Sequence, residues 1–119
     1  MKRDISPHFS REEFACKCGC GMDTVDVELV SVLEAIRVYF DCPVTITSGN
    51  RCEEYNKKIG GAMTSQHIKS RAADIVVQCA PAKVVQEFLD RYYPSSLGIG
   101  YADNFTHIDT RKKKARWTY

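Results

Sequence analysis

The spacing of apolar residues along this chain changes from a helical period to a strand period. Leu29 and Leu33 share one face of a segment that runs from Asp23 or Thr24 to Phe40. Spacings of three and four residues place apolar side chains on one side of a helix, so this segment is expected to form the longest helix. Beyond it, most apolar residues alternate with polar ones or lie in short runs, which is typical of strands.

Shorter elements follow from the same patterns together with their start and stop signals. A capping box, in which Ser10 and Glu13 bond each other's backbone, predicts a short helix. Strands are expected over 44–47, 71–77, 97–101 and 105–110, and further helices over 10–14, 53–59 and 81–93. The last two strands read as a hairpin across residues 102–104. We therefore expect an α+β fold with a small, largely antiparallel sheet and flanking helices.

Length and composition restrict the class of protein. A chain of 119 residues, 44% of them hydrophobic, predicts one packed domain over residues 1–119 rather than a disordered segment. No window approaches the roughly 18 consecutive apolar residues of a membrane helix, so no membrane insertion is expected. The basic start Met1–Pro7 has no apolar region after it, which predicts no signal peptide and a cytoplasmic location at synthesis.

The charge balance gives no general attraction to nucleic acid. Lysine and arginine number 17 against 15 acidic residues, a net charge of +2. The only local excess, over Arg111–Arg116, is typical of a solvated terminus, although it could attract anionic cell-wall polymers or a membrane surface. Trp117 and Tyr119 would then be aromatic anchors, or they cover the core. We expect a monomer with no nucleic-acid partner.

The six cysteines leave three interpretations open. They are Cys16, Cys18, Cys20, Cys42, Cys52 and Cys79. Free buried thiols are the default for a chain without a signal peptide, and a metal cluster or one or more disulfides are the alternatives. The first three fit a structural zinc module poorly, because paired zinc ligands are usually two to four residues apart. Cys52 could meet them in space.

Two of the three histidines stand near carboxylates. Asp74 follows His67 by seven residues, and Asp109 lies two residues after His107 on an expected strand, where alternate residues share a face. Two imidazoles and one carboxylate are a sufficient zinc set, and three protein ligands leave a position for water, as in catalytic sites. Spacing alone leaves open that the histidines are hydrogen-bonded core or surface residues, or bind another metal.

Ordered motifs cover nearly the whole chain. The histidines lie in Ser65-x-His67-x-x-Ser70-x-Ala72-x-Asp74 and Phe105-Thr-His107-Ile-Asp109. The other motifs are His8-Phe-Ser-Arg-Glu-Glu-Phe-Ala-Cys-Lys-Cys-Gly-Cys-Gly21, Ser48-Gly-Asn-Arg51-Cys-Glu-Glu-Tyr-Asn56, Gly60-Gly-Ala62, Gly98-Ile-Gly100 and Ala115-Arg-Trp117. Together they resemble the zinc D-Ala-D-Ala carboxypeptidase family, which has the Hedgehog/DD-peptidase fold and includes small phage and prophage cell-wall enzymes.

The resemblance implies roles for individual residues. The metal ligands of the family fall on His67, Asp74 and His107. Arg51 falls where relatives hold an arginine near the reacting carbonyl or the substrate carboxylate, and a surface ion pair is its alternative. Ser65 would orient a ligand or meet the substrate, and an ordinary loop cap is its alternative.

Two positions depart from the family pattern. Ser70 stands where relatives have glycine, which is costly if the position needs a positive φ. Asn104 stands where many relatives have an acidic residue, and an amide cannot act as a general base. We expect Asp109 to be the general base, with Asp103 in reserve. The alternative for Asp109 is a carboxylate that fixes the tautomer of His107.

The resemblance implies metal-assisted hydrolysis of peptide bonds in peptidoglycan stem peptides or cross-bridges, with one catalytic zinc ion and with Arg51 stabilising the oxyanion. It does not distinguish a D-Ala-D-Ala carboxypeptidase from a murein endopeptidase. Such a substrate lies outside the cytoplasm, so we expect release by a phage lysis route. The alternatives are a non-catalytic, zinc-stabilised binding module of the same fold and a zinc module that binds nucleic acid.

Overall fold

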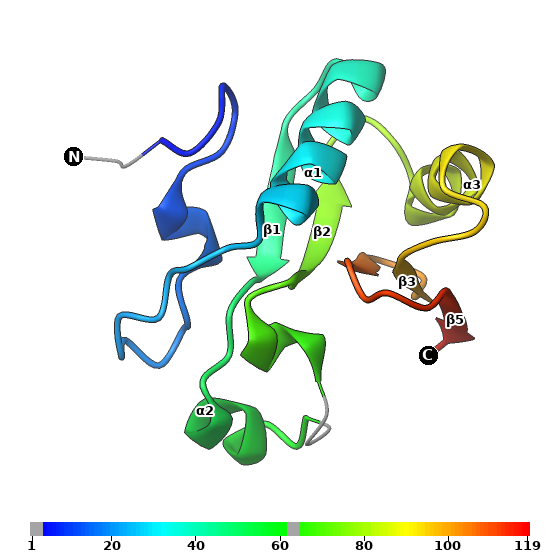
Figure 1. Cartoon of the computed structure of the whole chain (residues 1–119). Coiled ribbons are helices and arrows are strands. Elements are labelled where there is room, and N and C mark those ends of the chain that lie inside the picture. Colours follow the sequence, from blue (N-terminus) through cyan, green and yellow to red (C-terminus); the bar gives the residue numbers. More distant parts are fainter. Residues whose placement is uncertain (1–3, 62–64) are drawn as a thin grey trace.

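Five strands form one sheet in the order β1-β2-β4-β3-β5. The computed structural model describes residues 4–61 and 65–119 (Figure 1), so Met1–Arg3 and Ala62 of the Gly60–Ala62 motif lie outside the described residues. In chain order the elements are η1 (Arg11–Phe14), α1 (Val27–Phe40), β1 (Val44–Ser48), α2 (Glu53–Lys58), η2 (Gln66–Lys69), β2 (Ala72–Val77), α3 (Ala82–Tyr92), β3 (Gly98–Tyr101), β4 (Thr106–Asp109) and β5 (Ala115–Thr118). All strand pairs are antiparallel except β3 with β5. The expected α+β class is confirmed.

Helix α1 begins later than its apolar pattern predicts, at Val27 rather than at residue 23 or 24. The residues before it are extended because they bond to the loop after η2. The backbone N–H of Asp26 donates to the carbonyl of Ser70 at 2.9 Å, and the hydroxyls of Thr24 and Ser70 lie 2.7 Å apart. Ser70 has a φ of 61°, so this position does require the left-handed region. The hydroxyl contact is one that glycine could not make.

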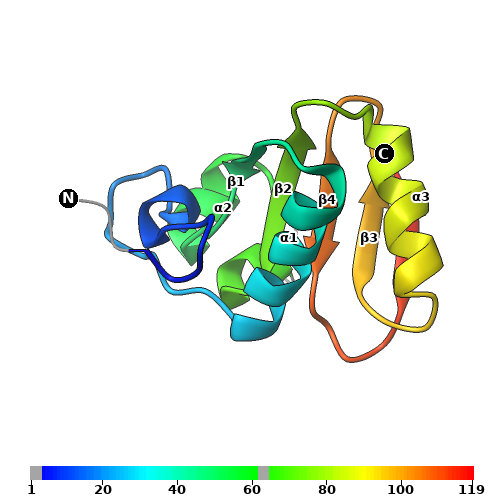
Figure 2. The same ribbon diagram turned by 90° about the horizontal axis from the view of Figure 1, so that it is seen from above.

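One face of the sheet packs on α1 and α3, as Figure 2 shows from above. Ile75, Ile99 and Ile108 lie on the same face of three adjacent strands and are at most 1% exposed. They meet the apolar sides of the two helices, of which Leu33 and Leu89 are 0% exposed. Alternate residues of a strand point to opposite faces of the sheet. The residues directly before and after each of these isoleucines therefore lie on the other face, away from the two helices.

Only part of the basic segment near the C-terminus is solvated: Lys112–Lys114 are exposed, whereas Arg111 and Arg116 are half-buried. Residues 115–118 form β5, which pairs in parallel with β3. The guanidinium of Arg116 donates to Asp90 at 2.8 Å and to the carbonyls of Leu97 and Tyr93 at 2.8 and 2.9 Å. These bonds fasten β5 to α3 and to the loop before β3. The expectation of a free terminus is therefore wrong for β5.

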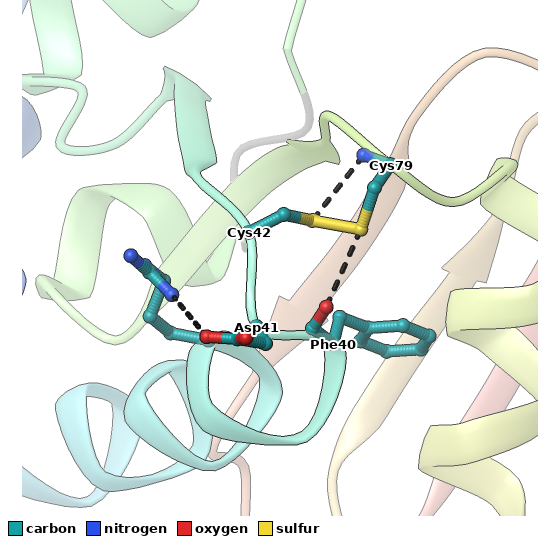
Figure 3. The surroundings of a disulfide bond; sticks show 5 residues. Phe40, Asp41, Cys42 and Cys79 are labelled. Atoms are coloured by element: carbon teal, nitrogen blue, oxygen red, sulfur yellow. Dashed lines mark hydrogen bonds and ion pairs between the residues drawn. A yellow bond between two sulfur atoms is a disulfide. The ribbon is translucent and has the colours of Figure 1, made fainter.

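A disulfide joins Cys42, in the turn between α1 and β1, to Cys79, which follows β2 (Figure 3). The two residues continue the β1–β2 pair beyond the partners Val44 and Val77. Free thiols are therefore wrong for this pair. The other four cysteines are free and lie together near the end of β1 opposite to the disulfide.

In the part of the chain that the structure describes, no helix has the length and apolar character needed to cross a bilayer.

Candidate metal centre

Register places the chemistry-bearing residues in one row across the sheet. Asp74 of β2 lies opposite His107 of β4, His107 lies opposite Gly100 of β3, and Gly100 lies opposite Trp117 of β5. Directly opposed residues in neighbouring strands share a face, so these side chains emerge together on the side away from α1 and α3. His67 reaches the same place from η2, just before β2.

His67, Asp74 and His107 meet at one point. One ligand atom of each lies within 4.8 Å of the other two, and all three side chains are buried. Oδ1 of Asp74 is 3.4 Å from Nε2 of His67 and 3.0 Å from Nδ1 of His107. The structure thus brings together the three residues that the resemblance assigned as ligands.

The far nitrogen of each imidazole has its own partner. Nδ1 of His67 is 2.7 Å from the carbonyl of Gly49, and Nε2 of His107 is 2.7 Å from Oδ2 of Asp109. Carbonyl and carboxylate oxygens only accept, so these nitrogens are the donors. In the neutral ring, the opposite nitrogen, which faces Asp74, would then carry the lone pair that a metal ion binds. A hydrogen bond that fixes the tautomer in this way is typical of metal-bound histidine.

The electrostatics of the group favour a cation at its centre. Burial opposes ionisation of Asp74, but its bonds to His107 and His67 outweigh burial and hold the pKa of its carboxyl well below the ordinary value. Burial also lowers the pKa of His107, but Asp109 and Asp74 outweigh it and raise that pKa. Without a metal, Nδ1 of His107 must be protonated, because an unprotonated nitrogen would repel the carboxylate of Asp74. Two nitrogens and an oxygen around one point fit Zn²⁺, which could take that proton's place.

Asp109 lies behind His107 and is saturated with donors. It is 0% exposed, and Arg111 binds both of its oxygens at 2.7 Å. Burial opposes ionisation of Asp109, but Arg111 and His107 lower the pKa of its carboxyl well below the ordinary value. Gly98 makes room for this pair, because a methyl group there would overlap the Asp109 carboxylate. Sequence reasoning assigned Arg111 to a solvated tail, although its place two residues after Asp109 was the available signal.

A pocket of about 420 Å³ opens over the ligands. Two cationic residues, Arg51 and Arg111, line this pocket, together with the aromatic residues Phe105, Trp117 and Tyr119. The ring centroids of Trp117 and His107 are 5.0 Å apart, and Arg111 lies 5.0 Å from the Trp117 ring centroid. Trp117 therefore covers the metal centre rather than the hydrophobic core. Sequence reasoning missed this role, which depends on the pairing of β5 with β3.

The remaining expected site residues lie in different places. Ser65 lines the pocket, and its hydroxyl accepts from the backbone N–H of His67 at 3.2 Å, which makes it the cap of η2. Arg51 lines the pocket and donates to Oδ2 of Asp74 at 3.4 Å. Asp103 and Asn104 lie in the turn between β3 and β4 and line a separate cavity beside the end of β2. Neither of them lines the pocket of the metal centre.

A buried set of two histidines and an aspartate that could hold a metal ion, open to a pocket lined by cationic and aromatic residues, is what a metal-dependent hydrolase requires. The chain belongs to the peptidase M15 family, because the family model described as Peptidase M15 matches residues 7–109. M15 peptidases are zinc-dependent, so this protein is a zinc metallopeptidase. Among curated proteins and among solved structures, none matches the chain significantly.

Proposed function

We propose that this metallopeptidase hydrolyses peptide bonds in the stem peptides or cross-bridges of peptidoglycan. The observation that carries the proposal is the convergence of His67, Asp74 and His107 beneath a pocket lined by Arg51. The substrate class rests on the motif resemblance to D-Ala-D-Ala carboxypeptidases. A zinc ion held by these three residues supplies Lewis acidity, which polarises a carbonyl and lowers the pKa of water toward about 7.

Arg51 is suited to bind the substrate. Its guanidinium donates to Ser48, Asn56 and Asp74 at 3.3, 3.5 and 3.4 Å, and all three contacts are long. Such contacts can be exchanged for a substrate carbonyl or carboxylate, which the planar guanidinium binds through two parallel hydrogen bonds. We therefore assign Arg51 to the substrate and to the negative charge that develops on the reacting carbonyl.

For Asp109, the geometry supports the positioning role over the general base. Both oxygens already accept from Arg111, one of them also accepts from His107, and the lowered pKa makes the carboxylate a weak base. A general base must reach the proton that it removes. Asp109 instead lies behind the imidazole and holds it with Nδ1 directed at the metal position.

The Cys42–Cys79 disulfide supports a site of action outside the cytoplasm, because structural disulfides persist mainly in oxidising compartments. Peptidoglycan lies in such a compartment. A phage lysis route, inferred from the resemblance to small phage-type enzymes, remains our proposal for how the protein reaches it.

The test is mass spectrometry of muropeptides before and after digestion of purified sacculi by the zinc-loaded protein. A carboxypeptidase removes a terminal alanine from stem peptides, whereas an endopeptidase converts cross-linked dimers to monomers. His67→Ala should abolish both zinc binding at this centre and cleavage. Lys69→Ala, an exposed change on the same short helix, should leave both intact.

If the zinc-loaded protein cleaves no muropeptide, catalysis on peptidoglycan is wrong. The same protein should then be tested for binding to sacculi, since a non-catalytic module of this fold would be retained on them.

A further inference from the structure

A second group of potential metal ligands lies apart from the pocket. The four free cysteines Cys16, Cys18, Cys20 and Cys52 have their sulfur atoms within 4.8 Å of one another. Three come from the loop after η1, and Cys52 is the residue just before α2. All four lie in the motifs that carry the resemblance, but the resemblance assigns no role to them.

The loop is folded so that its alternate cysteines converge. In an extended strand, residues two apart share a face, but they are separated by roughly 6.6 Å. Here Gly19 and Gly21 have φ values of 84° and 90°, and the N–H of Gly19 donates to the carbonyl of Cys16 at 3.2 Å. The left-handed turn at Gly19, between Cys18 and Cys20, bends the chain and helps to bring the three thiols together.

Two of the distances between the sulfur atoms are close to those around one tetrahedral ion. Zinc–sulfur bonds of about 2.3 Å at tetrahedral angles require sulfur atoms about 3.8 Å apart. Sγ of Cys18 lies 3.4 Å from Sγ of Cys16 and 3.6 Å from Sγ of Cys52. These separations are close to the required value and too long for the S–S bond of a disulfide.

Backbone N–H groups point at two of the sulfur atoms. The N–H of Cys52 donates to Sγ of Cys16 at 3.4 Å, and the N–H of Tyr55 donates to Sγ of Cys52 at 3.4 Å. Hydrogen bonds of this kind support the negative charge of a thiolate and orient it, as is usual around metal ligands.

We propose that Cys16, Cys18, Cys20 and Cys52 bind one structural zinc ion, separate from the catalytic one. In a protein that forms the Cys42–Cys79 disulfide, four neighbouring thiols would be expected to oxidise unless a metal held them as thiolates. Four sulfur ligands leave no position for water, so this zinc has a structural role.

The proposed zinc would fasten the N-terminal loop to the segment that serves the catalytic centre. Gly49, whose carbonyl accepts from His67, and Arg51 both lie within three residues of Cys52. The N–H of Arg51 in turn donates to the carbonyl of His67 at 3.1 Å. Loss of the structural zinc should therefore disturb the pocket although none of the four cysteines lines it.

The direct test is cobalt substitution of the full chain, purified without oxidant. Co²⁺ replaces Zn²⁺ in tetrahedral sites, and bound thiolates give it an intense sulfur-to-cobalt charge-transfer band in the near ultraviolet. The wild-type protein should show this band and hold about two zinc ions per chain by elemental analysis. His67→Ala should lose about one of these ions and keep the band.

The double variant C18S/C20S should lose the band and about one zinc ion, whereas Lys17→Ser in the same loop should keep both. If the wild-type protein shows no thiolate band, the proposal is wrong. It is equally overturned if mass spectrometry of unreduced peptides finds these cysteines paired in disulfides. Neither result depends on the variants folding, and neither bears on the His67, Asp74 and His107 centre.

Discussion

His107 is held between two carboxylates, and this arrangement determines what Asp109 can contribute. Asp74 faces its Nδ1 at 3.0 Å, and Asp109 faces its Nε2 at 2.7 Å. The first carboxylate shares the metal position, while the second fixes the ring. Asp109, two positions along the strand, thus controls the tautomer of the metal ligand His107 without lining the pocket.

Asp109→Asn should lower zinc affinity at the catalytic centre by about 10- to 100-fold, because the amide can no longer hold His107 as a carboxylate does. Zinc affinity is measured by competition with a chelator, and the thiolate-to-cobalt band of the four cysteines shows separately whether the other site keeps its ion. Asp103→Asn, in the turn away from the pocket, is the control. Activity lost at unchanged zinc affinity would instead indicate that Asp109 is the general base.

At the level of single elements, β5 completes the site although it follows both histidine motifs in the sequence. It adds Trp117 to the row that begins with Asp74, and it is fastened by Arg116. Its pairing is parallel, so no tight turn links it to β3. The intervening residues 102–114 contain β4, whose Asp109 lies in the same sheet.

Arg116→Ala should lower the free energy of unfolding by about 2 kcal/mol, since a charged group that makes several hydrogen bonds is lost from a half-buried position. Trp117 is the only tryptophan of the chain, so its fluorescence reports directly on β5. Urea unfolding followed by this fluorescence measures the change, with Lys113→Ala on the exposed loop as control. Equal stability of the two variants would show that β5 does not depend on Arg116.

Much of the fold was predictable because its signals are local. Apolar periodicity located α1, α3 and the β3–β4 hairpin, and the strand rule put His107 and Asp109 on one face. The start of α1 was wrong because Thr24 and Asp26 bond to Ser70, a tertiary contact. β5 was missed because consecutive cations precede it. The roles of Trp117 and Arg111 were missed for the same reason.

At the scale of the whole molecule, the disulfide joins the turn before β1 to the turn after β2. Cys42 and Cys79 are 37 residues apart in the sequence, and the segment between them contains β1, α2, η2 and β2. The crosslink therefore restricts the unfolded chain across the region that supplies His67, Asp74 and Arg51.

Replacing both cysteines, as C42S/C79S, should lower the free energy of unfolding by about 2–4 kcal/mol. The disulfide closes a loop in the unfolded chain and so lowers its entropy, and without the bond this stabilisation of the folded state is lost. Urea denaturation of the wild-type and variant proteins measures the difference. Thiol titration under denaturing conditions checks that the wild-type protein has this bond. A variant as stable as the wild-type protein would show that the crosslink adds nothing to stability.

Strand β3 has glycine at the two positions where residues of the catalytic centre need the space of a side chain. A methyl group at Gly98 would collide with Asp109 and Arg111, and one at Gly100 would come within 2.8 Å of the Trp117 indole nitrogen. In a comprehensive mutational survey, these two positions should tolerate substitution as poorly as the ligands themselves. Alanine, usually chosen as the neutral replacement, would be harmful at both.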